Sequence, residues 1–428
     1  MADIDLPVFS FLPDWAGGVT ENLSFLTDVL RAEEGAEQRR ILRLTPRRTL
    51  EADFLLYGAD RTFWDLFMSR LSGGEIMVPL YWDIGRLSAT LVPAVTNRLD
   101  LDTRWTEFAP GLAIIAGKRA LEYEVVEIVA VDDDGLDLAA PVDNPWPVGS
   151  AVMPLRRALI DDTGEVSHLS DRVATVSVQI GFSVRNPWVD QSVPVFYSGF
   201  PVFVSAPDWS GALGVAYDLE TLRLDNTTGL PYQVDSLGRA LLGQSHRWFL
   251  AGRERLAGFR DILYRHMGRA GALWLPTFKD DLRIVVDIAA VDDQIAVESV
   301  GYIYVGGPAS GREHIALRTA SGTVFRRVLA VSPGPSPAIE ILELDGPVGL
   351  DLATGQDYQL SFADLARFDQ DDFSLVHRTD TLGLTEVNAM FRTFKGTRTN
   401  PLPVSYPIPT AAMIEGTCGE AVDMTCYS

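Results

Sequence analysis

Apolar residues fall largely at every second position between Val19 and Gly58, in the run VTENLSFLTDVLRAEEGAEQRRILRLTPRRTLEADFLLYG. This alternation is the period of a β-strand that buries one face. The polar group Glu33-Glu34-Gly35 interrupts the alternation near its middle and forms a turn signal. We therefore predict a long β-hairpin over this segment.

The period of the pattern changes directly after the predicted hairpin. In residues 61–71, RTFWDLFMSRL, four apolar side chains recur at helical spacing, and Gly73-Gly74 follow. Glycine just beyond the last periodic residue is typical of a helix end. We predict a helix over 61–71, followed by a strand in IMVPLYW.

The next segment is β in character. Residues 112–116 and 123–131 are rich in apolar and β-branched residues, and Asp134-Gly135 is a favourable hairpin turn before residues 136–138. Turn signals then recur about every 8 to 12 residues, which is typical of a small barrel or sandwich.

The second half of the chain repeats the first. Pro13-Asp14-Trp15 recurs as Pro207-Asp208-Trp209, and the run from Phe63 to Asp83 is echoed from Phe259 to Asp280. The echo places a second helix at 259–267, closed by Gly268. A spacing of roughly 200 residues is too long for a solenoid repeat and fits a duplicated domain or domain pair.

These patterns predict a mainly β fold with a few helices, built as a tandem duplication. Each copy contains a tube-like β domain, formed by a barrel or hairpin with a packed helix, and a small β-barrel or sandwich. The predicted boundaries are 1–98 and 99–188 for the first copy, 189–290 and 291–396 for the second, and 397–428 for an extended, proline-containing tail.

Charge and hydropathy narrow the classes of function. The 428 residues include 58 acidic and 36 basic side chains, a net charge of −22, so a broad basic face for duplex DNA is not expected. No run approaches the roughly 18 apolar residues of a membrane span, and the first residues lack a basic region followed by an apolar core. We expect no membrane insertion and assembly in a cytoplasm.

The two cysteines, Cys418 and Cys426, both lie near the end of the chain. They exclude a disulfide framework for the body of the protein. Their spacing is compatible with a disulfide, with two free thiols, or with part of a metal or iron–sulfur site shared with another chain.

Catalytic constellations find little support. The five histidines are dispersed, and none forms an i, i+4 pair on a predicted helix. Asp132-Asp133-Asp134 lacks the alternate spacing and closing glutamate of a calcium loop, so a solvated hairpin tip is the simpler interpretation. We expect no enzymatic activity, no cofactor and no resident metal.

One basic cluster stands out, in the run EQRRILRLTPRRTLE. Arginine at this density beside glutamates suits bidentate pairing across subunit contacts, because its planar fork matches a carboxylate. The alternative is a solvated strand face with local ion pairs. The predicted subunit-interface residues are Glu37, Arg39, Arg40, Arg43, Arg47 and Arg48.

The segment from Leu26 to Asp83 resembles the N-terminal pattern of distal tail proteins of long-tailed bacteriophages and phage-like gene transfer agents. In both, an acidic-Gly turn leads to an arginine-rich strand opening E-x-R, a helix with Phe and Leu, a Gly-containing end and an aromatic-rich strand. The matching positions are Glu37, Arg39, Arg40, Arg47, Arg48, Leu66, Phe67, Gly73 and Trp82, with Phe259, Leu263, Gly268, Trp274 and Phe278 in the second copy.

The resemblance implies a structural virion protein at the tail tip. Such proteins form a ring that joins the tail tube to the baseplate hub and fibres, with neighbours linked by donated hairpins and DNA passing through the centre. The implied partners are further copies of the chain, the tube protein, and the hub and fibre proteins. Three tandem chains would give a ring of six similar units. A hub protein of the tail tip resembles the same plan and is the close alternative.

A carbohydrate-binding or carbohydrate-cleaving tail component is a second alternative. Nine Trp and 12 Tyr residues could line sugar grooves. Cleavage would require a carboxylate pair at a fixed separation, which an acidic sequence offers without identifying. The repeat favours the ring, since a hydrolase has no need of matched copies.

Overall fold

The computed structural model describes residues 6–32, 35–71, 73–185, 188, 192–219, 221–235, 237–379 and 383–394. The chain divides into two units, Met1–Gly396 and Thr397–Ser428. Cys418, Cys426 and the predicted tail lie in the second unit, outside the described residues. The first unit is mainly β, which confirms the predicted fold class.

The elements of the first half follow the predicted order. They are β1 (Val19–Ser24), β2 (Thr27–Arg31), β3 (Glu37–Ile41), β4 (Arg47–Tyr57), α1 (Ala59–Arg70), β5 (Ile76–Pro79), the 3-10 helix η1 (Tyr81–Asp83), β6 (Gly85–Arg86), β7 (Arg98–Asp100), β8 (Gly111–Ala116), β9 (Tyr123–Asp132), β10 (Gly135–Leu138), β11 (Ala151–Thr163), β12 (Ser167–His168) and β13 (Val173–Phe182).

The second half contains a comparable series. Its elements are β14 (Phe196–Tyr197), β15 (Phe200–Pro201), β16 (Val215–Asp218), β17 (Thr221–Leu224), β18 (Tyr232–Asp235), β19 (Leu241–Leu250), α2 (Arg253–His266), β20 (Leu273–Pro276), β21 (Gln294–Glu298), the 3-10 helix η2 (Gly307–Ser310), β22 (His314–Thr319), β23 (Gly322–Pro333), β24 (Ile339–Leu344), β25 (Tyr358–Phe368), β26 (Asp372–His377) and β27 (Thr385–Thr393).

The predicted long hairpin is present. β1 pairs antiparallel with β4, and β2 pairs antiparallel with β3 further along the same excursion. Alternate residues of β4 are buried, as the two-residue period requires. α1 begins after Gly58, whose φ of 58° favours glycine, and it buries Trp64 and Phe67 against Phe9 and Phe11.

A small β unit with its own core lies between β5 and β11. Its strands β8, β9 and β10 coincide with the predicted strands, and the β9–β10 turn falls at Asp133-Asp134. Arg98 of β7 bridges Asp132 and Asp134 at this tip, each at 2.8 Å. β11 then returns to pair with β5, and β13 pairs with β4 along its length.

The second half repeats this pairing scheme. β16, β19 and β27 pair as β1, β4 and β13 do, and β20 pairs with β25 as β5 does with β11. Glu21 lies opposite Leu50, and Val215 lies opposite Gln244, so both members are shifted by 194 residues (215 minus 21, 244 minus 50). Tandem duplication stays our prediction for the origin of this recurrence.

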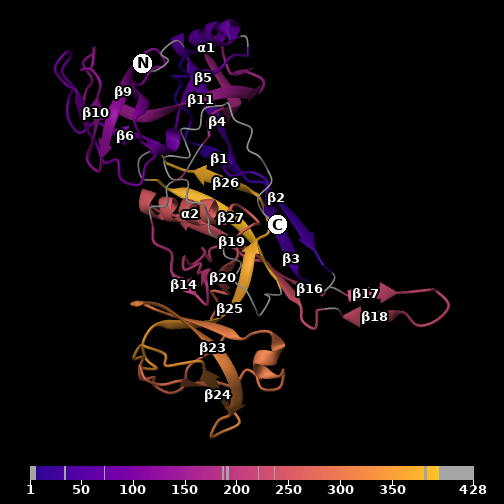
Figure 1. Cartoon of the computed structure of the whole chain (residues 1–428). Coiled ribbons are helices and arrows are strands. Elements are labelled where there is room, and N and C mark those ends of the chain that lie inside the picture. Colours follow the sequence, from indigo (N-terminus) through magenta and orange to yellow (C-terminus); the bar gives the residue numbers. More distant parts are fainter. Residues whose placement is uncertain are drawn as a thin grey trace, which may run out of the picture. The chain divides into compact units, whose positions relative to one another are not determined.

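One antiparallel sheet runs through both halves, because β26 of the second half pairs with β1 of the first. The pairings give the strand order β11-β13-β4-β1-β26-β27-β19-β16, part of which can be followed in Figure 1. The inward residues of these strands fill two hydrophobic cores, one for each half. The boundary between the halves is therefore a strand pairing inside a sheet.

Candidate functional site at the joint between the two halves

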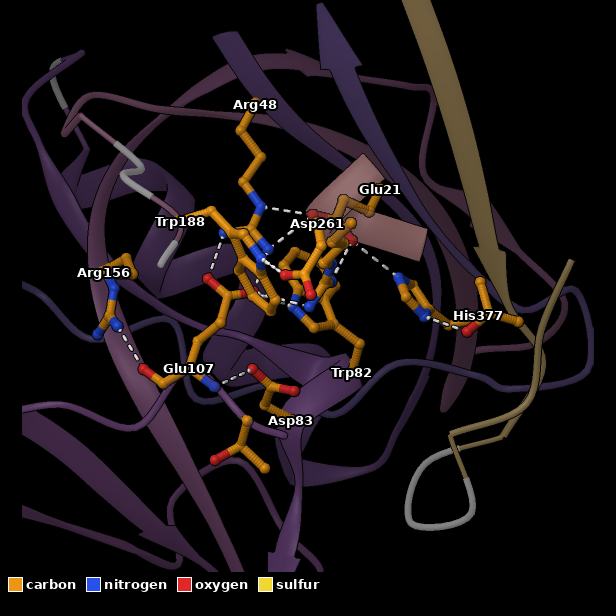
Figure 2. Close-up of polar contacts among 12 residues, drawn as sticks. Glu21, Arg48, Trp82, Asp83, Glu107, Arg156, Trp188, Asp261 and His377 are labelled. Carbon is orange, nitrogen blue, oxygen red and sulfur yellow. Dashed lines mark hydrogen bonds and ion pairs between the residues drawn. The ribbon is translucent and has the colours of Figure 1, made fainter. Parts of the chain in front are cut away.

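A buried ionic cluster lies where the two halves meet, and Figure 2 shows it in close-up. We call it the ionic joint. It brings together side chains from β1, β4, the loop after β7, α2 and β26, which are Glu21, Arg48, Glu107, Arg260 and His377.

Glu21 is the centre of the ionic joint. The alternating burial of β1 directs Glu21 inward together with Val19 and Leu23, and its exposed fraction is 0 %. Arg48 Nε donates to Glu21 Oε1 at 2.7 Å, and Arg260 Nη2 lies 2.5 Å from Oε2. His377 Nε2 lies 3.1 Å from the same Oε2. One carboxylate thus ties β4, α2 and β26 together.

Glu107 supplies the second carboxylate. Arg48 Nη1 donates to Glu107 Oε2 at 2.6 Å, and a second contact makes this pair bidentate. Arg260 Nη1 lies 3.1 Å from Oε1, and Trp82 Nε1 donates to that oxygen at 3.2 Å. Two guanidinium groups therefore face two carboxylates, so the buried charges of these four side chains balance.

Aromatic rings cover the ionic joint. The Arg48 guanidinium lies 4.6 Å from the Trp82 ring centroid, and the His377 ring stacks on Trp82 at 5.3 Å. On the α2 side, Trp188 lies 5.3 Å from the Arg260 guanidinium and donates through Nε1 to Asp261 at 2.6 Å. Rings at these distances favour the cations and exclude water from them.

The protonation states follow from burial and charge. Burial alone would raise the pKa of Glu21, but Arg260 and Arg48 outweigh it and hold that pKa well below its usual value. The same balance, dominated by Arg48, lowers the pKa of Glu107 to about 2. Burial lowers the pKa of His377, which favours its neutral form. Both carboxylates are ionised and engaged at neutral pH.

Asp83 is a buried acid beside the ionic joint, and its pKa is raised. Burial and the nearby Glu107 charge raise the pKa of Asp83 to about 6. Its Oδ2 accepts a hydrogen bond from the Glu107 backbone N–H at 2.9 Å, which fixes the loop that carries Glu107. The arrangement holds charged partners in place, and a structural clamp is the role that these contacts support.

The β2–β3 hairpin forms a second contact between the halves. Glu37 pairs with Arg367 of β25, with Nε–Oε2 at 2.8 Å and Nη2–Oε1 at 3.0 Å. Arg39 donates through Nη1 to the Ala270 carbonyl at 3.0 Å. The Thr27 backbone N–H donates to Asp371 at 2.9 Å. This hairpin of the first half is therefore docked on the second half.

Some of the predicted interface residues make the contacts described above, and others are exposed to solvent. Arg48 belongs to the ionic joint, and Glu37 and Arg39 belong to the docked hairpin. Arg43 Nη1 donates to the Ser24 carbonyl at 2.6 Å. Arg40 and Arg47 are exposed. Their predicted role between subunits stays a prediction, while four of the six residues make contacts within one chain.

The sequence reasoning missed Glu21, Glu107 and Arg260. A signal existed for Glu21, because it occupies an inward position of the alternating run VTENLS, where a charge requires a buried partner. Nothing in the sequence indicated which residues supply that partner. Arg260 lies 239 residues away, and only the pairing of β1 with β26 brings α2 close.

Other kinds of site were sought across the described residues. No group of three or more His, Cys, Asp and Glu side chains among them is arranged to hold a metal ion. No helix among the described residues has the length and apolarity that crossing a bilayer requires. A shallow hollow of about 450 Å³ lies on the first half, and its lining includes Glu51, Asp53 and Asp162 but no described aromatic residue.

No protein-family model matches the chain, and no curated protein sequence matches it.

Proposed function

We propose that this chain is a structural ring protein of a phage-type tail tip, which connects the tail tube to the baseplate hub and fibres around a DNA channel. The observation that carries the proposal is the single sheet through both halves, with the β1–β26 pairing and the ionic joint between them. Two similar units held side by side form a sector of a ring, and three such sectors would place six units around an axis.

The outward face of the sheet supports a channel lining. Asn22 of β1 donates to Glu51 of β4 at 3.0 Å and accepts from Ser374 of β26 at 2.5 Å, so polar contacts cross from one half to the other. Glu51 and Asp53 are exposed on this face. Together with the net charge of −22, such a face would repel passing DNA and prevent adhesion.

A rigid joint also suits the proposed role. A ring that transmits load between a tube and a baseplate needs fixed angles between its units. The charge-assisted contacts of the ionic joint are buried and short, and pairs of this kind are directional. Solvent-exposed pairs would hold the two halves less firmly.

The proposal is tested by native mass spectrometry of the purified chain with negative-stain imaging. We expect a three-chain ring with six similar lobes and an open centre. Added tail tube protein should stack on one face of the ring, and cryo-electron microscopy of that complex would distinguish the distal tail position from the hub position. A stable monomer that does not associate with tube protein would overturn the proposal.

No observation favours the carbohydrate alternative. The hollow on the first half combines carboxylates with backbone and small polar groups, whereas sugar grooves present aromatic faces. A glycan array with the purified chain would check this directly, because specific glycan binding by a monomer would promote that alternative over the ring.

A further inference from the structure

Among the described strands, the sheet has an open edge at each end. At one end, β16 pairs with β19, and no other described strand lies on its far side. At the other end, the short strand β12 pairs only with β13 among the described strands. Within the chain, β1 of the first half corresponds to β16 of the second half. Unlike β16, β1 has a partner on its far side, because it pairs with β26.

The apolar residues that β1 and the residue after Ser24 bury in the second half have exposed counterparts at the open edge of β16. Leu23 and Phe25 belong to the first half but are buried in the core of the second, with exposed fractions of 0 % and 2 %. The shift of 194 residues that relates β1 to β16 places Tyr217 and Leu219 at these positions (23 plus 194, 25 plus 194). Their exposed fractions are 68 % and 67 %.

The two hairpins differ in the same way. In the β2–β3 pair, Thr27 lies opposite Ile41, and in the β17–β18 pair, Thr221 lies opposite Asp235, so the same shift relates them. The β2–β3 hairpin is docked, and Thr27 is buried at 3 % exposure. All four residues of β17 are exposed, and Figure 1 shows the β17–β18 hairpin extending from the rest of the described chain.

The first half offers the receiving surface. In the β26–β27 pair, His377 lies opposite Thr385. In the β12–β13 pair, His168 lies opposite Ala174. His168 therefore occupies the position on the open edge of the first half that His377 occupies on β26, where β26 pairs with β1. His168 is exposed, as are Gly164 and Glu165 in the turn that precedes β12. The open edge is therefore free to receive a strand.

One pair of positions changes together between the two surfaces. Arg367, which binds Glu37, directly follows Ala366, and Ala366 pairs with the first residue of β20. In the first half, Leu159 directly follows Ala158, and Ala158 pairs with the first residue of β5. Leu159 is thus the counterpart of Arg367, and the shift of 194 makes Pro231 the counterpart of Glu37. The counterparts of an ion pair are both apolar. Leu159 is 38 % exposed, and Pro231 is also exposed.

We infer that the open edge of β16 and the β17–β18 hairpin dock on the β12 edge and the Leu159 surface of a second copy of this chain. Tyr217 and Leu219 insert there as Leu23 and Phe25 do inside the chain, and Pro231 packs on Leu159 of the second copy. The contact is head-to-tail, so it generates a ring where the rotation closes. It specifies the interface of the ring proposed above and rests on that proposal.

The first test is cross-linking of the full chain. In a Cys418→Ser/Cys426→Ser background, the double variant Pro231→Cys/Leu159→Cys is treated with a short bis-maleimide. We expect two-chain and three-chain products, and no larger species. The controls are the two single variants and the mismatched pair Pro231→Cys/Val291→Cys, which uses a position 79 % exposed in the second half. These controls should give at most about a tenth of the product.

The second test removes the inserted side chains. Tyr217→Asp/Leu219→Asp should weaken self-association by at least about tenfold in sedimentation, because two charges would enter an apolar contact. Val291→Asp should leave self-association unchanged. The substituted residues are exposed, so circular dichroism should report an unaltered fold.

The outcomes separate this inference from the proposed function. A ring in native mass spectrometry without the 231–159 cross-link would overturn the interface and leave the ring proposal standing. A cross-linked three-chain species that does not associate with tube protein would support the interface and count against the tail role. Cross-linking confined to single chains would show that the hairpin folds back on its own first half, and would overturn the inference.

Discussion

Removal of the Glu21 carboxylate charge should loosen the contact between the two halves. Glu21→Gln keeps the size of the side chain but leaves Arg48 and Arg260 facing only Glu107, with both guanidinium groups 2 % exposed or less. The remaining three charged side chains then carry one positive charge in excess, which the neighbouring Asp83 can partly offset. The reverse change, Arg260→Met, leaves a buried carboxylate charge in excess.

The magnitude follows from the distances. Glu21 has guanidinium nitrogens 2.5 and 2.6 Å from its oxygens. At an effective dielectric constant of about 20, a pair of charges about 4 Å apart interacts with about 4 kcal/mol. Desolvation offsets much of that in the intact cluster, but removal of one partner exposes the cost, so we expect a loss of about 3–5 kcal/mol for each single variant.

A double-mutant cycle is the assay. Urea denaturation of the two single variants and of Glu21→Gln/Arg260→Met gives the coupling energy. The double variant restores charge balance, and we expect it to be more stable than the sum of the singles by at least about 2 kcal/mol. Hydrogen exchange across the β1–β26 pairing should increase in the singles. The exposed pair of Arg104 and Asp102 provides the control, where Arg104→Met should cost less than about 1 kcal/mol.

Additive losses in the cycle would refute the reasoning, because independent effects would mean that Glu21 and Arg260 do not share one electrostatic environment. Single losses below about 1 kcal/mol would refute it as well, since that magnitude belongs to solvent-exposed pairs.

Three further predictions concern packing, backbone and pH. Phe25→Ala should destabilise the second half by about 3–5 kcal/mol in urea denaturation although the residue belongs to the first half, because Phe25 fills the second core; a loss under about 1 kcal/mol would contradict that placement. Gly268→Ala should cost more than Gly238→Ala in thermal unfolding: both glycines have a φ of 69°, but only at Gly268 would a new Cβ meet neighbours, namely the Asp371 carboxylate and, at 3.1 Å, the Phe25 Cβ, so equal losses would argue against this close contact. Burial lowers the pKa of both His246 and His266 to about 4. As the pH falls, these histidines are therefore protonated in the unfolded chain before they are protonated in the folded chain. The free energy of unfolding should fall between about pH 6.5 and about pH 4, by on the order of 3 kcal/mol for each fully buried histidine. Replacement of either histidine by Gln should flatten the pH dependence of the melting temperature over that window, and an unchanged slope would count against the assignment.

The local elements could be predicted because their signals lie within a few residues. Alternation gave the long hairpin, and the change of period gave α1 within two residues of its observed start. The second helix was placed at 259–267, but α2 begins at Arg253. Three charged residues open the segment RERLAG before its first apolar residue, Leu256, and Gly252, with φ of 94°, allows the helix to start there.

The candidate site could likewise be predicted only in part. The arginine-rich run marked Arg48 and Glu37 as residues that need carboxylate or guanidinium partners, since the sequence places dense charge on strands. It did not identify the partners, because Arg367 lies 330 residues from Glu37 and Arg260 lies 239 residues from Glu21. Contacts between residues so far apart in the sequence depend on which strands are neighbours in the sheet. The alternation of apolar and polar residues along one strand does not identify its neighbours.

By itself, then, the sequence determined the strand and helix periods, the internal repeat and the acidic balance, all of which are properties of short windows or of composition. The tertiary structure alone decided that β1 pairs with β26, that Glu21 becomes the centre of a balanced ionic joint, and that one hairpin is docked while its counterpart is exposed. The physical reason is that a strand carries two hydrogen-bonding edges, and its sequence does not specify which strand satisfies each of them.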